Sequence, residues 1–467
     1  MSGRHDHRLV GPRAVSTLID LGFAPIAAGV IARRRPMMAV LERVQADARA
    51  VRRMRQLRRA HGRGPVELVL PGRRIIVVID PDDVGAVLEQ SPFPFHPANR
   101  EKRAALRHFQ PHAVLASEGS IRAERRTLNE TALATGQPLH HLAEPFTAVI
   151  AEEARALTTT ALRHGRLDAA QFTIEWWRLV RRLVLGDQAR FDDTITDQLW
   201  KLRSAANWSF LGFPHPRLRE KFTERLYDYA ETASPETLLG ALTKTPATGA
   251  ADPIGQVPHW LFAFDAAGIA LTRTLALLAT HPEQRARALA EAGDLGNPAL
   301  RPYLRACMLE SVRLWPTTPT ILRDTTEDTQ WRCGEERFTI DGGAAVLIAV
   351  PAFHRDEQLL PFAHDFTPDI WLDGRAEQYP QLVPFSAGPA ECPGRNLVLF
   401  VTSTLLAQLI GNADFTLRST PAPTPGRPLP VTFNNFGLDF GVAAPRSTVG
   451  PQSAGGGPSA EMPRSSA

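Results

Sequence analysis

The chain has 467 residues, of which 43% are hydrophobic and 22% charged, and its formal net charge is only +4. These values are ordinary for a globular protein and give no reason to expect nucleic acid as a partner. Three cysteines, none of them in a C-x-x-C pair, are too few for a disulfide scaffold and argue against a structural zinc site. We therefore expect a large globular fold in a reducing, cytoplasmic compartment.

The N-terminal segment, residues 1–36, contains an apolar stretch from Val15 to Ala32. Asp20 and Pro25 interrupt this stretch, and it is shorter than the roughly 20 apolar residues that a spanning helix needs. No secretory cleavage site stands out after it. We expect no stable membrane span and a segment that docks on the protein surface; peripheral contact with a membrane is the alternative.

Further along the chain, helical periodicity predicts helices over residues 37–60, 81–89, 145–164, 172–185, 193–210 and 218–233. Residues 259–280 are apolar on nearly all sides, which predicts a helix in the centre of the protein. Another helix is predicted over 397–410.

Short β-branched runs at 66–70 and 74–79, separated by Pro71-Gly72, predict a hairpin. Further strands are predicted at 337–340, at 345–350 and as a pair within 415–440. The pattern indicates a mainly α fold with small β-sheets, in which residues 37–445 form a single domain. A Gly/Ser/Pro-rich tail, 446–467, is predicted to be disordered.

One loop carries the strongest chemical signal. Residues 385–395 read Phe-Ser-Ala-Gly-Pro-Ala-Glu-Cys-Pro-Gly-Arg and lead into an apolar helix. Free backbone N–H groups and the positive end of the helix dipole favour a thiolate at Cys392. The alternative is that Cys392 packs as a small hydrophobic residue.

This stretch resembles the heme-binding loop of cytochromes P450, F-x-x-G-x-x-x-C-x-G, at Phe385, Gly388, Cys392 and Gly394. The resemblance implies the cytochrome P450 fold, heme b (iron protoporphyrin IX) as the cofactor, and Cys392 as the ligand of its iron. Family members usually carry His or Arg two positions before the cysteine, where this chain has Ala390. One contact to a heme propionate is therefore missing or supplied from elsewhere.

The E-x-x-R sequence at Glu310 and Arg313 resembles the buried pair that braces the proximal side of the heme in this family. Its third partner usually lies in an F-x-P-x-R-[F/W] segment. Residues 366–371 resemble that segment, but Ile370 occupies the place of the arginine. We expect an altered triad, or another residue that completes it.

Three arginines resemble the family's contacts to the heme propionates. Arg323 lies in the strand that follows the E-x-x-R helix, and a guanidinium suits a carboxylate through paired hydrogen bonds. Arg122 and Arg126, one helical turn apart, resemble the helix pair that also holds these groups. For Arg122 the alternative is a solvated basic face shared with Arg125.

The central helix resembles the distal helix of the family, where A-G-x-[D/E]-T supplies an acid and an alcohol. Counted back from His281, this chain has Ala263 at the glycine place, Asp265 at the acid place and Ala266 at the alcohol place. Oxygen activation needs two protons on the distal side, so Asp265, Ala266 and Gly268 are the candidate catalytic positions. Asp265 could act through water, with Gly268 permitting a helix distortion that admits it; the alternative is that Asp265 braces a neighbouring helix.

The resemblance implies a heme-thiolate oxidoreductase of the monooxygenase type that acts on a small hydrophobic organic molecule, and we expect a role in secondary metabolism. The sequence contains no flavin domain and no nucleotide-binding motif, so we expect ferredoxin and ferredoxin reductase as electron donors, docking near Arg395.

Alternatives to this function stay open at this point. The missing alcohol fits atypical chemistry (coupling, rearrangement or peroxide-driven oxidation) and also fits a non-catalytic heme protein. A cysteine hydrolase using Cys392 lacks a convincing histidine partner.

Overall fold

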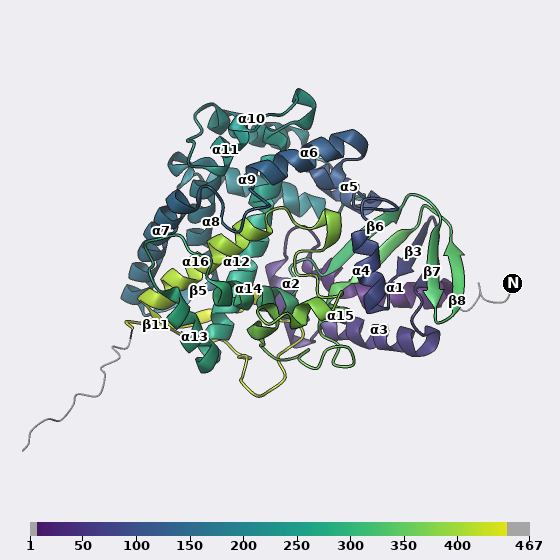
Figure 1. The fold of residues 1–467 in the computed structure, drawn as a ribbon. Helices are drawn as coiled ribbons and strands as arrows, with labels where there is room; N and C mark the ends of the chain where they lie inside the picture. The colour runs from purple at the N-terminus through teal and green to yellow at the C-terminus, as the bar shows by residue number, and fades with distance from the viewer. Residues whose placement is uncertain (1–6, 446–467) are drawn as a thin grey trace, which may run out of the picture.

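The structure is a computed structural model that describes residues 7–445, and Figure 1 shows helices filling its left and centre with the largest sheet on the right. The predicted tail, 446–467, lies outside the described residues. The first half contains α1 (Gly11–Ala28), α2 (Arg35–Arg43), α3 (Asp47–His61), α4 (Pro81–Glu89), α5 (Arg100–Leu106), α6 (Gly119–Ala132), α7 (Ala143–His164), α8 (Ala169–Leu185), α9 (Asp193–Ala206), α10 (Pro216–Glu231) and α11 (Leu238–Lys244). The second half contains α12 (Val257–Thr280), α13 (Pro282–Ala292), α14 (Pro302–Leu314), α15 (Val350–His354) and α16 (Arg395–Asn412).

Three small sheets accompany the helices in the described part of the chain. The largest has the strand order β1-β2-β3-β9-β6-β4, formed by β1 (Arg8–Val10), β2 (Val66–Leu70), β3 (Arg73–Val77), β4 (Phe95–His96), β6 (Thr320–Thr325) and β9 (Ala345–Ala349). A second sheet joins β5 (Arg166–Asp168), β10 (Asp414–Leu417) and β11 (Asp439–Ala443), and a third pairs β7 (Thr329–Cys333) with β8 (Glu336–Ile340). The predicted hairpin is β2–β3, with Val66 opposite Val77, and the predicted C-terminal strand pair is β10–β11.

The helix predicted over residues 37–60 is wrong as one element, because α2 and α3 are separate helices. Gln45 lies between them with a left-handed φ of 46°. Its side-chain amide donates to the backbone oxygen of Thr432 at 3.0 Å and accepts from the N–H of Val431 at 2.7 Å. The break is therefore fixed by a segment almost at the other end of the chain, which local periodicity does not reveal.

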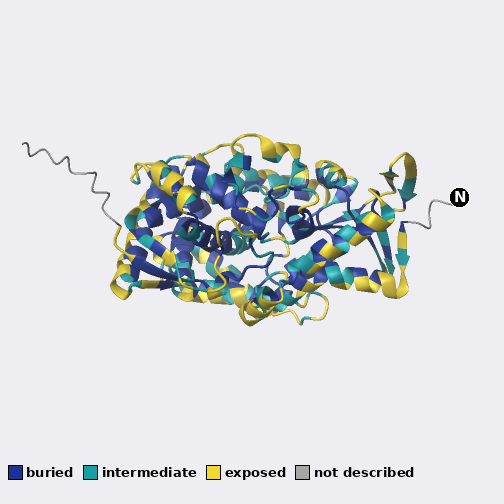
Figure 2. Ribbon diagram, turned by 90° about the horizontal axis from the view of Figure 1, so that it is seen from below, coloured by how far each residue is buried: buried dark blue, intermediate teal, exposed yellow. Residues whose placement is uncertain are grey.

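The predicted central helix is α12, which packs against α8, α14 and α16. Within the described residues, the segment Gly249–Thr280 is the one that is long and apolar enough to span a membrane, and 78% of its most apolar window is buried inside the fold. Figure 2 shows buried residues concentrated in the interior of the helical part. The apolar character of α12 is accounted for by its place in the core.

Helix α14 carries the E-x-x-R pair, and both side chains are fully buried. Arg313 binds both carboxylate oxygens of Glu310, at 2.7 and 2.8 Å. Glu310 also accepts hydrogen bonds from the N–H of Thr367 at 2.9 Å and from Nε1 of Trp371 at 3.0 Å. Glu310 thus accepts hydrogen bonds from a backbone amide and an indole, at the place where a second arginine was expected. Ile370 packs in an apolar cluster instead.

This pair gives a graded stability prediction. Glu310→Gln leaves the buried Arg313 charge without its counter-charge, so we expect a loss of about 3–5 kcal/mol in the free energy of unfolding. Trp371→Phe removes one hydrogen bond to a carboxylate and should cost about 2 kcal/mol. Urea unfolding of both variants measures the difference; equal losses would show that the charge pair is not what stabilises this region.

Candidate functional site

The cysteine loop is closed by its own backbone. The N–H of Cys392 donates to the oxygen of Phe385 at 3.0 Å, and the N–H of Glu391 donates to the oxygen of Gly388 at 2.9 Å. Gly388 has a left-handed φ of 64°, and a Cβ at this position would lie 2.3 Å from the backbone oxygen of Leu88. Helix α4 therefore packs so tightly on the loop that only glycine fits there.

The electrostatic environment of the Cys392 sulfur has opposing parts. Burial raises the pKa of the thiol, whereas a hydrogen bond from the backbone N–H of Gly394 and the charges of Arg126 and Arg395 lower it. Helix α16 begins at Arg395, so the sulfur lies just ahead of the helix and not within its first turn. The site suits a thiolate that gains a cationic partner of its own, as iron would provide.

Arg126 connects α6 to the cysteine loop. Its Nη1 donates to the backbone oxygen of Glu391 at 2.7 Å, and its Nε forms an ion pair with Glu130 at 2.5 Å. Two of its donor groups are thus engaged beside Cys392, and its contact to a propionate stays a prediction. Arg395 forms an exposed ion pair with Glu391 at 2.7 Å.

A cluster of buried cations lies near the loop. Arg323 donates to Ser91 at 3.0 Å and to Ser386 of the loop at 3.4 Å. Burial, followed by the charge of Arg122, lowers the pKa of Arg323 to about 10. Burial and the charge of Arg323 lower the pKa of Lys102 well below its usual value, although the carboxylates of Asp324 and Glu101 act in the opposite direction. Like charges this close disfavour one another unless an anion joins them.

Arg122 lies on α6 and is only 7% exposed, so the solvated basic face considered for Arg122 and Arg125 is wrong. The two differ in their partners. Arg125 donates to Ser117 and to the backbone of Ala250 and Ala251, whereas the buried Nε of Arg122 has no hydrogen-bond partner among the described residues. The Nε–H group of Arg122 is therefore a buried donor without an acceptor in the described part of the chain.

These groups fit heme. A cysteine sulfur suits its iron, and the cluster of Arg122, Arg323 and Lys102, which forms no ion pair with a carboxylate within residues 7–445, suits its two propionates. Lys102 was not singled out from the sequence. It also donates to the backbone of Pro97 and Leu322, which brings α5 against β6.

On the distal helix, Asp265 forms an ion pair with Arg203 of α9, with Nη2 and Oδ2 2.6 Å apart. The same nitrogen of Arg203 also donates to the backbone oxygen of Ile31 at 2.9 Å. This geometry is the bracing arrangement considered as the alternative for Asp265. Ala263 and Ala266, three residues apart on α12, are only partly buried and bring no polar side chain.

Gly268 has a different role from the one expected. Helix α12 runs without interruption from Val257 to Thr280, so the expected distortion is absent. A Cβ on Gly268 would lie 2.6 Å from Nε1 of Trp176, and that indole nitrogen donates to the backbone oxygen of Phe264 at 2.9 Å. Gly268 makes room for a tryptophan of α8, a constraint of packing rather than of water entry.

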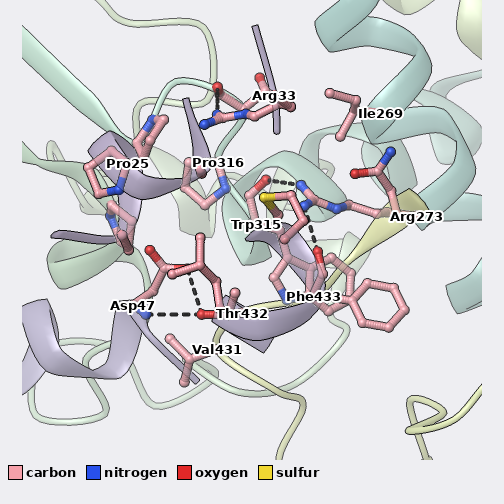
Figure 3. Close-up of a pocket in the computed structure, with 18 residues that line it drawn as sticks. Pro25, Arg33, Asp47, Ile269, Arg273, Trp315, Pro316, Val431, Thr432 and Phe433 are labelled. Atoms are coloured by element: carbon pink, nitrogen blue, oxygen red, sulfur yellow. Dashed lines mark hydrogen bonds between the residues drawn. The ribbon is translucent and has the colours of Figure 1, made fainter. Parts of the chain in front are cut away.

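A separate small cavity lies between α1, α2, α12 and residues 431–435 (Figure 3). Arg273 donates across one side of it to the backbone oxygens of Trp315 and Phe433, at 3.1 and 2.6 Å. Burial lowers the pKa of Arg273 to about 9 and raises the pKa of Asp47. The cavity has a volume of about 50 Å³, which is enough for a few water molecules. No residue of the cysteine loop lines it.

Substitution of Arg122 tests whether the cation cluster holds heme. Arg122→Gln should speed the loss of heme about tenfold, because a charge-assisted hydrogen bond contributes about 1.5–3 kcal/mol. Arg125→Gln is the matched control, since both arginines are buried on the same helix. Transfer of heme to an acceptor apoprotein measures the rate. Equal acceleration in both variants would mean that the effect comes from a general loosening of α6.

Comparisons with known proteins agree with this geometry. The family model described as Cytochrome P450 matches residues 263–434, which include the distal helix from Ala263 onward, Arg323 and Cys392. A cyclooctat-9-en-7-ol 5-monooxygenase of Streptomyces melanosporofaciens is 30% identical over 227 residues, which cover 44% of this chain and 48% of that protein. Cytochrome P450 4g15 of Drosophila melanogaster is 31% identical over 150 residues, 30% of this chain and 26% of that protein. The chain thus matches less than half the length of these relatives.

Solved structures match over a longer span. A retinoic acid-bound cyanobacterial cytochrome P450, CYP120A1, has a TM-score of 0.66 at 19% identity and covers 84% of this chain and 93% of its own. A second cytochrome P450, CYP102L1, has a TM-score of 0.67 at 17% identity and covers 85% and 94%. At these identities the likeness shows the fold. That fold is mainly α with small β-sheets, and over residues 263–434 the sequence is similar to the family described as Cytochrome P450.

Proposed function

We propose that the protein is a heme-thiolate monooxygenase that oxidises a small hydrophobic organic molecule with dioxygen. The observation that carries this proposal is the Cys392 loop, which holds a sulfur atom beside the N–H of Gly394 and the charge of Arg126. Heme b, when bound, supplies the redox chemistry that activates dioxygen. Cys392 would ligate the iron, and the N–H of Gly394 would tune how strongly the sulfur donates electrons.

The cationic cluster has the second role in this proposal. Arg122, Arg323 and Lys102 would hold the propionates and so fix the orientation of the cofactor. Their mutual repulsion in the free protein is relieved when two carboxylates arrive. Binding of the cofactor and completion of this part of the fold are therefore coupled.

Proton delivery is assigned to Asp265, because Ala266 has no hydroxyl group to offer. In this structure the carboxylate contacts Arg203. To reach the distal side it must act through water or turn away from Arg203 about its side-chain bonds. The ion pair would then set how readily the acid becomes available.

Several finer parts of the proposal rest on the relatives and on composition. Two relatives are named for cyclooctat-9-en-7-ol and drimenol, which supports an apolar substrate and a place in secondary metabolism. Ferredoxin and ferredoxin reductase are proposed as the electron donors, docking near the exposed Arg395. The three free cysteines support a cytoplasmic location.

Isotope labelling tests the reaction class. The protein is supplied with ferredoxin, its reductase, NADPH and a panel of terpenoid alcohols that shift the heme spectrum on binding. Incorporation of one atom of ¹⁸O from labelled dioxygen into the product supports a monooxygenase. An oxidised product with no label points to coupling or rearrangement, which the missing hydroxyl at Ala266 would favour. Spectral binding without any product points to a non-catalytic heme protein.

Asp265→Asn tests the assignment of the acid. With dioxygen and the electron donors, we expect product formation to fall about a hundredfold, the lower range for loss of a general acid. Hydrogen peroxide already carries both protons, so peroxide-driven oxidation should fall far less. The ratio of the two rates separates the roles: an equal fall in both would show that Asp265 only braces α9 through Arg203.

A further inference from the structure

One peptide group connects the cysteine loop to the end of α6. It consists of the backbone oxygen of Pro393 and the N–H of Gly394, and it is trans. The hydroxyl of Thr135 donates to this oxygen at 2.7 Å, and the N–H of Gly394 donates to the sulfur of Cys392. A trans peptide points its oxygen and its N–H in opposite directions. Thr135 and the sulfur therefore lie at the two ends of one hydrogen-bonded chain.

The N–H of Gly394 is the backbone donor that the loop leaves for the sulfur. Pro393 has no N–H, and the N–H of Cys392 itself donates to the oxygen of Phe385 at 3.0 Å. The N–H of Arg395 donates to the oxygen of Cys392 at 3.3 Å. A Cβ on Gly394 would lie 4.0 Å from the sulfur, so the backbone of Gly394 passes close to it. The strength of this one hydrogen bond therefore affects the charge that the sulfur keeps.

Thr135 is held in place by contacts that do not involve its hydroxyl. It follows the end of α6, where its N–H donates to the backbone oxygen of Glu130 at 3.0 Å. The side-chain amide of Asn396, on α16, donates to the backbone oxygen of Thr135 at 3.2 Å. Arg305, on α14, donates in turn to the amide oxygen of Asn396 at 2.9 Å. Removal of the hydroxyl therefore leaves the contacts that position residue 135.

The hydroxyl bond of Thr135 differs from those of threonines inside helices. Thr147 and Thr402 donate to backbone oxygens four residues earlier in their own helices, as helical threonines commonly do. Thr135 instead donates to a residue 258 positions further along the chain. This bond is a tertiary contact, and its acceptor belongs to the peptide group that also donates to the sulfur.

We infer that Thr135 tunes the electron donation of the Cys392 sulfur through the peptide group between Pro393 and Gly394. A hydrogen bond accepted by a peptide oxygen polarises the whole group and strengthens its N–H as a donor, by about 10–30% per bond. Thr135 thus draws electron density from the sulfur without touching it, and it acts as a positioning residue. The inference rests on the proposed function, because it requires heme iron on Cys392.

Thr135→Val in the heme-loaded protein tests the inference, because valine keeps the shape of threonine and lacks the hydroxyl. A weaker N–H bond leaves more electron density on the sulfur, which disfavours reduction of the iron. We expect the equilibrium constant for reduction, measured against a redox dye, to fall about twofold. The C–O stretching frequency of the reduced carbon monoxide complex should also fall, since a more electron-rich iron donates more density to the ligand. Thr135→Ser keeps a hydroxyl and should leave both quantities at the values of the unaltered protein.

Thr402→Val is the matched control. Thr402 lies on α16, the helix that follows the cysteine loop, and its hydroxyl donates to the oxygen of Val398 at the same 2.7 Å. That oxygen does not belong to the peptide group that donates to the sulfur. The equilibrium constant for reduction and the C–O frequency should therefore stay unchanged in this variant.

Three results would overturn the inference. The first is that neither quantity changes in Thr135→Val, and the second is that both change equally in Thr135→Val and Thr402→Val. The third is that Thr135→Ser shifts them as much as Thr135→Val does. Neither measurement needs a substrate or turnover, so failure of the monooxygenase proposal in the labelling experiment leaves this test intact. Absence of a red-shifted Soret band in the unaltered protein would overturn the iron ligand and this inference together.

Discussion

The position of the Cys392 sulfur depends on contacts that several helices of this protein make with its loop. Burial raises the pKa of the Cys392 thiol, so a thiolate forms there only if nearby groups favour the charge. The N–H of Gly394 and the guanidinium of Arg126 supply that support, and the contact of Gly388 with α4 fixes the loop from the other side. Helices α4, α6 and α16 thus hold a short loop whose conformation the loop residues alone would not determine.

Buried arginines are the second feature that shapes the fold, and they fall into two kinds. Arg313 forms an ion pair with Glu310 and also donates to backbone oxygens, and Arg273 donates to the backbone oxygens of Trp315 and Phe433, so both tie distant loops together. Arg122 and Arg323 lie close together without a carboxylate partner in the described part of the chain. The first kind completes the protein fold, and the second kind would, in the proposed function, bind the acidic edge of the cofactor.

Much of this could be predicted from the sequence, because local patterns carry it. The period of apolar residues predicted the central helix, and the spacing around Cys392 predicted the loop. What escaped prediction depends on partners far along the chain. Gln45 breaks a helix through contacts with residues 431–432, Trp371 takes over an arginine's role at Glu310, and Arg203 engages Asp265 from another helix. None of these pairings has a periodic signature, since each is decided by tertiary packing.

The most direct measurement is the absorption spectrum of the purified protein, reduced and then exposed to carbon monoxide. A strongly red-shifted Soret band is expected, because a thiolate ligand donates electron density to the iron. Cys392→Ser should abolish that band, whereas Cys307→Ser, at a buried cysteine of α14, should leave it unchanged. Protein that holds no heme, or a Soret band typical of a neutral ligand, would contradict the assignment of Cys392 as the iron ligand.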